Sequence, residues 1–175
     1  DVTASIATNQ TILVVGGGIS GMTAALEAAE CGKQVILVEK TPVLGGRTAR
    51  LYRYFPKMCH PTCGLEINLR RIKQNRNIRL MTMTEVTAVS GSRGNYEVTL
   101  KVTPRFVNEN CTACGKCAEA VTTEVSNPWN YGLDKMKAAY LPHNMAYPQR
   151  YVIDPSIVGT PEGEKASWEL VHFIR

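Results

Sequence analysis

A glycine-rich turn between an apolar run and a helix-forming segment constrains this chain more than any other feature. Gly16, Gly18 and Gly21 have the G-x-G-x-x-G spacing. The first glycine permits a tight turn out of a strand, the second lets the backbone approach a pyrophosphate, and the third lets helix and strand pack closely. N–H groups at the helix start then receive the phosphate charge. Glycine loops without a ligand also show this spacing, so the flanking segments decide.

The flanking segments supply the context that the motif requires. Residues 11–15 (TILVV) and 34–38 (QVILV) are short apolar runs, typical of strands buried on both faces. Residues 22–31 (MTAALEAAEC) are rich in Ala, Leu and Glu and predict a helix that Gly32 ends. Strand, turn, helix and strand together fit one βαβ unit. We therefore expect an α/β, Rossmann-like fold.

An acidic residue, Glu39, ends the second apolar run, eighteen positions after Gly21. A carboxylate here accepts hydrogen bonds from the hydroxyls of an adenosine ribose. It also repels the extra phosphate of NADP, because the two charges are alike. Lys40, the next residue, is assigned to the same site. The sequence thus predicts a bound dinucleotide other than NADP.

The segment Gly45-Gly46-Arg47 favours FAD as that dinucleotide. It resembles the segment that closes over the pyrophosphate in flavoproteins with two dinucleotide-binding domains. Arg47 would add positive charge beside the phosphates. The alternative is an ordinary turn followed by a surface arginine.

Three cysteines, Cys111, Cys114 and Cys117, have the C-x2-C-x2-C spacing of a bacterial ferredoxin-type cluster motif. Gly115 and small neighbours allow backbone amides to turn toward cluster sulfides. The motif continues with a cysteine where this chain has Val121, so a [4Fe–4S] cluster needs a fourth ligand from elsewhere, while a [3Fe–4S] cluster needs none. A zinc site that borrows a histidine and a loop that binds nothing are the alternatives. We predict an iron–sulfur cluster.

Cys59 and Cys63 form a second cysteine motif, C-x3-C, soon after the proposed flavin segment. Pro61 and Gly64 predict that both lie on a loop, where functional residues are common. They can serve as a redox pair beside the flavin, as cluster ligands, or as unreactive thiols. Cys31, at the end of the first helix, is expected to be a packing residue.

Composition narrows the class of protein. The chain has a net charge of +5, with basic residues concentrated between Arg47 and Arg79. No nucleic-acid recognition motif accompanies them, so we expect a solvated basic face, assisted by an anionic cofactor or an acidic partner. No run approaches eighteen apolar residues, which predicts no membrane span. Residues 1–10 lack the features of a secretory signal, and we expect a cytoplasmic protein.

The rest of the chain divides into further elements and three parts. We expect a helix at 66–75, a third parallel strand at 78–83, a β-hairpin of 85–89 and 96–102 around a turn at 90–95, and a short strand at 151–154. The predicted parts are the first portion of an FAD-binding domain (11–106), a ferredoxin-like cysteine-rich insertion (107–137), and a return segment with tail (138–175).

Together these segments resemble the flavoprotein A subunits of heterodisulfide reductases and, more closely, those of the quinone-interacting membrane-bound oxidoreductase complexes of sulfate-reducing organisms. The resemblance spans residues 11–154. The matching stretches are ILVVGGGISGMTAALEAAECGKQVILVEKTPVLGGR, YFPKMCHPTCGLEINLRRIKQN, EVTAVSG, VNENCTACGKCAEA and GLDKMKAAYLPHNMAYPQRYVID. The second and the last of these are the most specific.

The resemblance implies a thioredoxin-reductase-like FAD domain interrupted by an iron–sulfur insertion. It implies electron transfer with sibling iron–sulfur and membrane subunits, linking menaquinone to adenylylsulfate reductase, and peripheral attachment to the inner membrane through those subunits. In heterodisulfide reductases it implies electron bifurcation. Family members are longer, and their closing apolar strand with an Ala-Thr-Gly-like turn is not found here, not even in residues 168–175. We therefore expect an incomplete flavin domain.

Three functions compete at this point. The first is an FAD-dependent iron–sulfur oxidoreductase subunit that transfers electrons. The second is a dithiol–disulfide oxidoreductase in which Cys59 and Cys63 form the reducible pair. The third is a non-catalytic nucleotide-binding assembly module. The sequence shows neither a Ser/His/Asp set nor paired carboxylates that would suggest a hydrolase.

Overall fold

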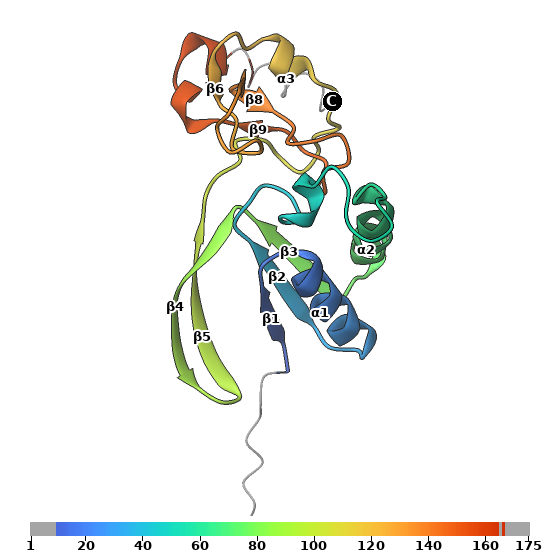
Figure 1. Ribbon diagram of the computed structural model, residues 1–175. Helices are drawn as coiled ribbons and strands as arrows, with labels where there is room; N and C mark the ends of the chain where they lie inside the picture. The colour runs from blue at the N-terminus through green and yellow to red at the C-terminus, as the bar shows by residue number, and fades with distance from the viewer. Residues whose placement is uncertain (1–9, 165, 167–175) are drawn as a thin grey trace, which may run out of the picture.

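The computed structural model describes residues 10–164 and 166 (Figure 1). The expectations for residues 1–9 and for the tail at 168–175 lie outside these described residues. Three strands form a parallel sheet in the order β1-β2-β3. They are β1 (Ile12–Val15), β2 (Val35–Glu39) and β3 (Ile78–Thr82). The α/β, Rossmann-like fold expected from the sequence is confirmed.

Helix α1 (Ile19–Glu30) covers one face of this sheet. Met22, Ala25, Leu26 and Ala29 recur at three- and four-residue spacing and are buried against the strands, as an amphipathic helix requires. The helix begins three residues earlier than predicted, directly after the glycine turn. The expectation that Cys31 is a packing residue is wrong. Cys31 is the C-cap of the helix, lies outside the buried stripe and is exposed.

Helix α2 (Thr62–Gln74) packs beside α1 on the same face (Figure 1). Leu65 and Ile72 are its buried residues and join the core around α1. A single 3₁₀ turn, η1 (Thr48–Arg50), precedes it. The helix starts four residues before the predicted boundary, with Pro61 as its N-cap. The prediction of a loop at Cys63 is therefore wrong, since Cys63 lies in the first helical turn.

An antiparallel hairpin, β4 (Thr84–Ser92) and β5 (Asn95–Val102), follows the sheet. The predicted six-residue turn is wrong, because pairing continues to Ser92 and Asn95 and leaves Arg93-Gly94 as the turn. A two-residue turn with glycine suits the twist of a hairpin. An apolar cavity of about 510 Å³ separates the hairpin from the sheet, between Leu13 and Ile36 on one side and Leu100 on the other.

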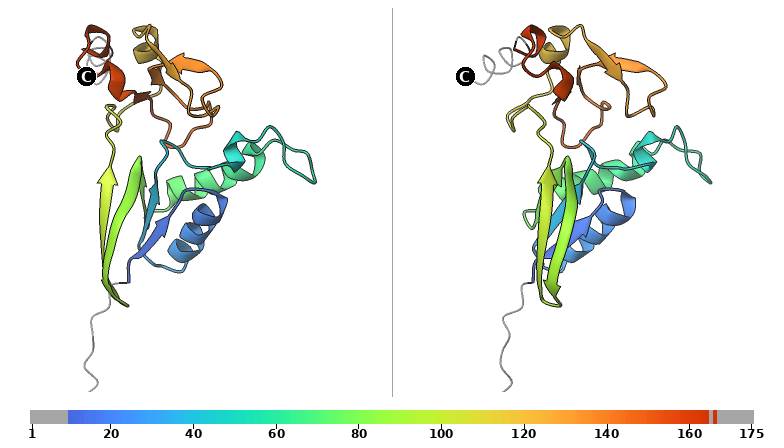
Figure 2. Two further views of the ribbon diagram at one scale, coloured as in Figure 1. Left: turned by 60° about the vertical axis from the view of Figure 1, so that its left-hand side comes forward. Right: turned by 90° about the vertical axis from the view of Figure 1, so that its left-hand side faces the viewer.

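Residues 107–157 form a second, smaller lobe, drawn above the sheet in Figure 2. Its elements are α3 (Lys116–Glu119), the pair β6 (Glu124–Ser126) and β7 (Lys135–Lys137), the pair β8 (Ala139–Tyr140) and β9 (Val152–Ile153), and η2 (Pro155–Ile157). Cys117 and Val121 share one hydrophobic cluster with Ala138, Ala139 and Ile153. The predicted insertion and return segment thus pack together, although the boundary drawn between them remains a prediction.

Arg105 connects the second lobe to the sheet. Its guanidinium donates to the hydroxyl of Thr82 at 2.9 Å, to the carbonyl of Arg150 at 3.1 Å and to the carbonyl of Pro42. Burial lowers the pKa of Arg105 to about 10, which leaves it charged at neutral pH. No helix in the described part of the chain is both long and apolar enough to cross a membrane.

Candidate functional site

The glycine turn has the geometry that its spacing predicts. Gly16 adopts a φ of +101°, a conformation that side chains disfavour, and its N–H donates to the carbonyl of Val38 at 2.7 Å. A Cβ at Gly21 would collide with the carbonyl oxygen of Gly16. A Cβ at Gly18 would meet nothing within 4 Å. Gly21 is thus required by the fold itself, whereas Gly18 faces open space at the start of α1.

Glu39 fastens the end of β2 to this turn. One carboxylate oxygen accepts the N–H of Gly17 at 2.5 Å, and the other accepts the N–H and hydroxyl of Thr41 at 2.7 and 2.8 Å. The side chain is buried, whereas Lys40 is exposed. A carboxylate has about four lone-pair positions, so one remains for a ligand hydroxyl. Contact with a ribose stays a prediction.

The segment Gly45-Gly46-Arg47 lies against the glycine turn. The N–H of Gly45 donates to the carbonyl of Gly17 at 2.8 Å. Gly46 has a φ of +55°, and a Cβ there would lie 3.1 Å from the Cα of Gly18. Arg47 is exposed. These close backbone contacts form a cradle without side chains, which fits the pyrophosphate of a dinucleotide.

A cavity of about 210 Å³ begins where this cradle ends. Ile19 contributes from the first turn of α1 and Thr48 from η1, next to Arg47. Tyr54 and Gly64 line it from the segment that carries the C-x3-C motif. The first turn of α1 and the segment that carries the C-x3-C motif, far apart in sequence, therefore border one cavity, although Cys59 and Cys63 are not among the residues that line it.

Tyr54 connects the cavity to the two thiols. Its backbone pairs with that of Cys59 in an antiparallel bridge, with N–H to carbonyl at 3.2 Å. A side-chain hydrogen bond to Cys59, followed by electrostatic interaction with Cys59, raises the pKa of Tyr54. Cys59 is half-buried and Cys63 is exposed, and both are free thiols. The structure thus places Cys59 directly against Tyr54, with Cys63 in the first turn of the helix that follows.

The cysteines at 111, 114 and 117 lie around a tight loop in the second lobe. Ala113 and Gly115 have φ values of +56° and +87°, which curl the backbone between the thiols. Cys117 is buried, and burial, followed by the charge of Cys111, raises its pKa to about 11. The described residues contain no group of three or more side chains arranged to hold a metal ion. The thiol side chains and their C-x2-C-x2-C spacing are those of an iron–sulfur donor set, and the cluster remains a prediction.

Val121, the position of the absent fourth cysteine, is fully buried. It packs in the cluster that includes Cys117, Ala138 and Ile153. The second lobe therefore uses this position for its core. A fourth ligand, if a cluster needs one, must come from another segment.

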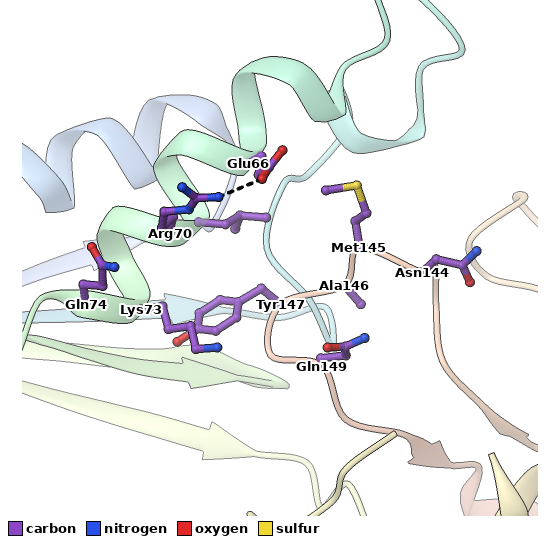
Figure 3. Close-up of a pocket in the computed structure, with 10 residues that line it drawn as sticks. Glu66, Arg70, Lys73, Gln74, Asn144, Met145, Ala146, Tyr147 and Gln149 are labelled. Carbon is purple, nitrogen blue, oxygen red and sulfur yellow. Dashed lines mark hydrogen bonds and ion pairs between the residues drawn. The ribbon is translucent and has the colours of Figure 1, made fainter. Parts of the chain in front are cut away.

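Sequence reasoning missed the residues of the return segment. Tyr147 accepts the N–H of Leu44 at 2.8 Å through its carbonyl, which fixes the return segment beside the Gly45–Arg47 turn. A groove of about 740 Å³ runs between α2 and this segment (Figure 3). Glu66 and Arg70 pair across one turn of α2 at 3.1 Å on one side, and Tyr147 and Met145 line the other. No periodicity in this segment could have placed it there.

His143, also missed, lies next to the groove. Its ring stacks on Trp129 with centroids 4.6 Å apart. Its Nε2 is buried and has no hydrogen-bond partner among the described residues. Burial lowers the pKa of His143, which favours the neutral form of the ring. The sequence gives no sign that this histidine is buried, because it is a single histidine in a segment without periodicity.

Comparison with known proteins gives this geometry a family context. Residues 11–64 match the FAD dependent oxidoreductase family. An iron–sulfur A subunit of the CoB–CoM heterodisulfide reductase of Methanopyrus kandleri is 40% identical over 87% of this chain and 23% of that protein. The corresponding A subunit from Methanocaldococcus jannaschii is 42% identical over 83% of this chain and 22% of its own length.

Solved structures are also similar to part of this chain. Histamine dehydrogenase from Rhizobium sp. 4-9 is 31% identical, with a TM-score of 0.38 over 47% of this chain and 12% of its own. Thioredoxin reductase of T. acidophilum is 22% identical, with a TM-score of 0.42 over 52% of this chain and 30% of its own. The chain spans less than a quarter of the length of the curated relatives it matches. It is related to the A subunits of the heterodisulfide reductases, and its residues 11–64 are similar to the FAD dependent oxidoreductase family.

Proposed function

We propose that the chain is the flavin-binding part of a heterodisulfide-reductase-type subunit that transfers electrons between FAD and thiol or iron–sulfur centres. The observation that carries this proposal is the cavity bordered by Ile19 of the glycine turn and Tyr54 of the cysteine segment. A dinucleotide held at the turn would extend toward the thiols of Cys59 and Cys63. When bound, FAD would accept electrons in pairs and release them one at a time.

The chain's own residues divide this task. The backbone of Gly16–Gly21 and Gly45-Gly46 would hold the pyrophosphate, while Glu39, with Lys40 beside it, would meet the ribose. Arg47 would balance phosphate charge from the rim of the site. Closing a disulfide between Cys59 and Cys63 releases two electrons and two protons, the number that one flavin takes up. Alternatively, Cys59 and Cys63 would serve as ligands of an iron–sulfur cluster.

Cys111, Cys114 and Cys117 would hold an iron–sulfur cluster, most simply a [4Fe–4S] cluster completed from another segment. Burial, followed by the charge of Cys111, raises the pKa of Cys117. A bound iron centre would favour the deprotonated form, because coordinated thiols lose their protons to a positive centre. Sibling iron–sulfur subunits would exchange electrons with this lobe.

A narrower candidate is the A subunit of a quinone-interacting complex, with membrane subunits and adenylylsulfate reductase as partners. The Tyr54–Asn75 and Gly132–Asp154 stretches of the sequence resemblance favour it. The curated relatives carry heterodisulfide reductase names, and one is named a ferredoxin-dependent enzyme, so the heterodisulfide reductase alternative has more support. Attachment to the inner membrane would depend on the quinone-interacting alternative.

Visible and EPR spectroscopy of anaerobically purified protein test the proposal. We expect a flavin spectrum that dithionite bleaches and an iron–sulfur signal. Cys114→Ser should remove the iron–sulfur signal and leave the flavin, and Cys31→Ser, at an exposed thiol outside both motifs, should change neither. Loss of a dithionite-reversible disulfide in Cys59→Ser would favour the redox pair over the ligand role. A colourless protein would contradict the proposal.

A further inference from the structure

We propose that residues 51–58, the projecting loop, form the docking surface for an acidic redox protein that exchanges electrons at the adjacent thiol pair. This inference rests on the proposed function. Figure 2 shows the loop, coloured teal between η1 and α2, extending away from the rest of the molecule in both views. It begins after η1 and ends at Cys59, so a protein bound to it would lie beside both cysteines.

The local backbone holds the loop out. Tyr54 and Cys59 pair in the antiparallel bridge described above, and the N–H of Met58 donates to the carbonyl of Tyr54 at 2.9 Å. These bonds close the base and leave Phe55-Pro56-Lys57 at the tip. Met58 has a φ of +51°, which is uncommon for a residue with a side chain. The tip is therefore fixed in position by its base and is not an extended linker.

Apolar side chains gather on this loop without cover. Phe55 is 86% exposed and Tyr52 is 76% exposed, while Leu51 and Met58 are each about half exposed. Single exposed apolar residues are ordinary, but a contiguous group with aromatic members is typical of a protein–protein contact. The arrangement predicts that Phe55 enters a partner surface as its apolar anchor.

Charge indicates what kind of partner this is. Residues 40–83 contain ten lysines and arginines and one acidic residue, Glu66, which is paired with Arg70. Arg53 and Lys57 flank the apolar tip and are exposed, and no salt bridge to either occurs within the described part of the chain. Cations around an apolar centre complement a surface with carboxylates around an apolar patch, and they speed encounter with it.

A redox protein is favoured over a lipid surface as the occupant. An anionic membrane would also attract aromatic and cationic side chains. The thiol pair decides between them, because Cys59 closes the base of the loop and Cys63 lies in the first turn of the next helix, exposed to solvent. A partner that delivers or removes electrons gains from this position, whereas a lipid surface does not.

Association kinetics with an immobilised acidic ferredoxin as the probe test the docking surface. The double variant Arg53→Glu/Lys57→Glu should associate about tenfold more slowly at low salt and lose most of its salt dependence. The matched control, Arg93→Glu/Lys101→Glu, changes the net charge equally on the exposed hairpin and should retain the wild-type rate. Phe55→Ser should chiefly raise the dissociation rate.

Three results would overturn the docking proposal: equal slowing in both double variants, unchanged rates in the loop variants, or binding to phosphatidylglycerol vesicles in place of the ferredoxin. Binding needs no flavin, so the outcome is separate from that of the proposed function. Loop-dependent binding by a protein without flavin or iron would support the docking surface and contradict the proposed function. A dithionite-reducible flavin in a protein without loop-dependent binding would support the proposed function and contradict the docking surface.

Discussion

The carboxylate of Glu39 accepts a hydrogen bond from the backbone N–H of Gly17 at 2.5 Å. This bond joins the end of β2 to the turn after β1, so the acid and the glycines behave as one rigid unit. Gly45, whose N–H donates to the carbonyl of Gly17 at 2.8 Å, extends the unit to the Gly-Gly-Arg segment. Preorganisation of this kind lowers the entropic cost of binding a ligand at the cradle.

Two motif glycines should respond differently to the same added methyl group. Gly18→Ala should fold with a free energy of unfolding within about 0.5 kcal/mol of the wild type, because its Cβ has open space and its φ is −73°. It should nevertheless lose FAD affinity, since the methyl occupies the phosphate position. Gly21→Ala should be destabilised by about 2 kcal/mol or more, because its Cβ meets the Gly16 carbonyl. Urea denaturation and FAD titration distinguish the two; wild-type FAD affinity in Gly18→Ala would contradict the phosphate assignment.

Arg105 should be the most costly arginine to remove from the described structure. Arg105→Leu loses its bonds to Thr82, Pro42 and Arg150 and leaves their acceptors without this donor. We expect a loss of about 2–4 kcal/mol in the free energy of unfolding. Lys101→Leu, an exposed cation on β5, should change it by less than about 0.5 kcal/mol. Equal effects in the two variants would show that Arg105 does not connect the lobes.

His143 should make stability depend on pH. Its pKa is lowered by burial in the folded state, so below the unfolded value of about 6.5 the unfolded chain binds a proton that the folded chain resists. The free energy of unfolding should therefore fall as pH drops from 7 to 5. His143→Phe should remove this part of the fall, whereas His60→Phe, at an exposed ring, should not. Urea denaturation midpoints at pH 7 and pH 5 measure this fall in stability. An equal fall in the wild type and in His143→Phe would refute the prediction.

The sequence predicted the βαβ unit well because periodic burial and glycine geometry are local properties. Residues 11–38 contain both the apolar runs and the turn, and the structure differs there mainly in the start of α1. It predicted the segment around Cys63 poorly, since Pro61 and Gly64 suggest a loop while Leu65 and Ile72 bury enough surface to extend the helix. Tertiary packing overrode the local signal.

The second lobe shows where sequence reasoning ends. Its core joins Val121 to Ala138 and Ile153, residues without a shared period, so no pattern could pair them. Arg105 and His143 derive their properties from neighbours that lie well away from them in the sequence. The cysteine motif, in contrast, is visible because its three thiols are close in sequence.

Equilibrium binding of FAD, with ADP and NADP⁺ as competitors, tests the central claim most directly. If the Gly16–Glu39 unit holds the ADP half of FAD, calorimetry of the purified chain should detect one FAD site. ADP should displace FAD, while NADP⁺ should not, because its extra phosphate would face the carboxylate of Glu39. A chain that binds neither FAD nor ADP, or that exchanges FAD for NADP⁺ as readily as for ADP, would contradict the claim.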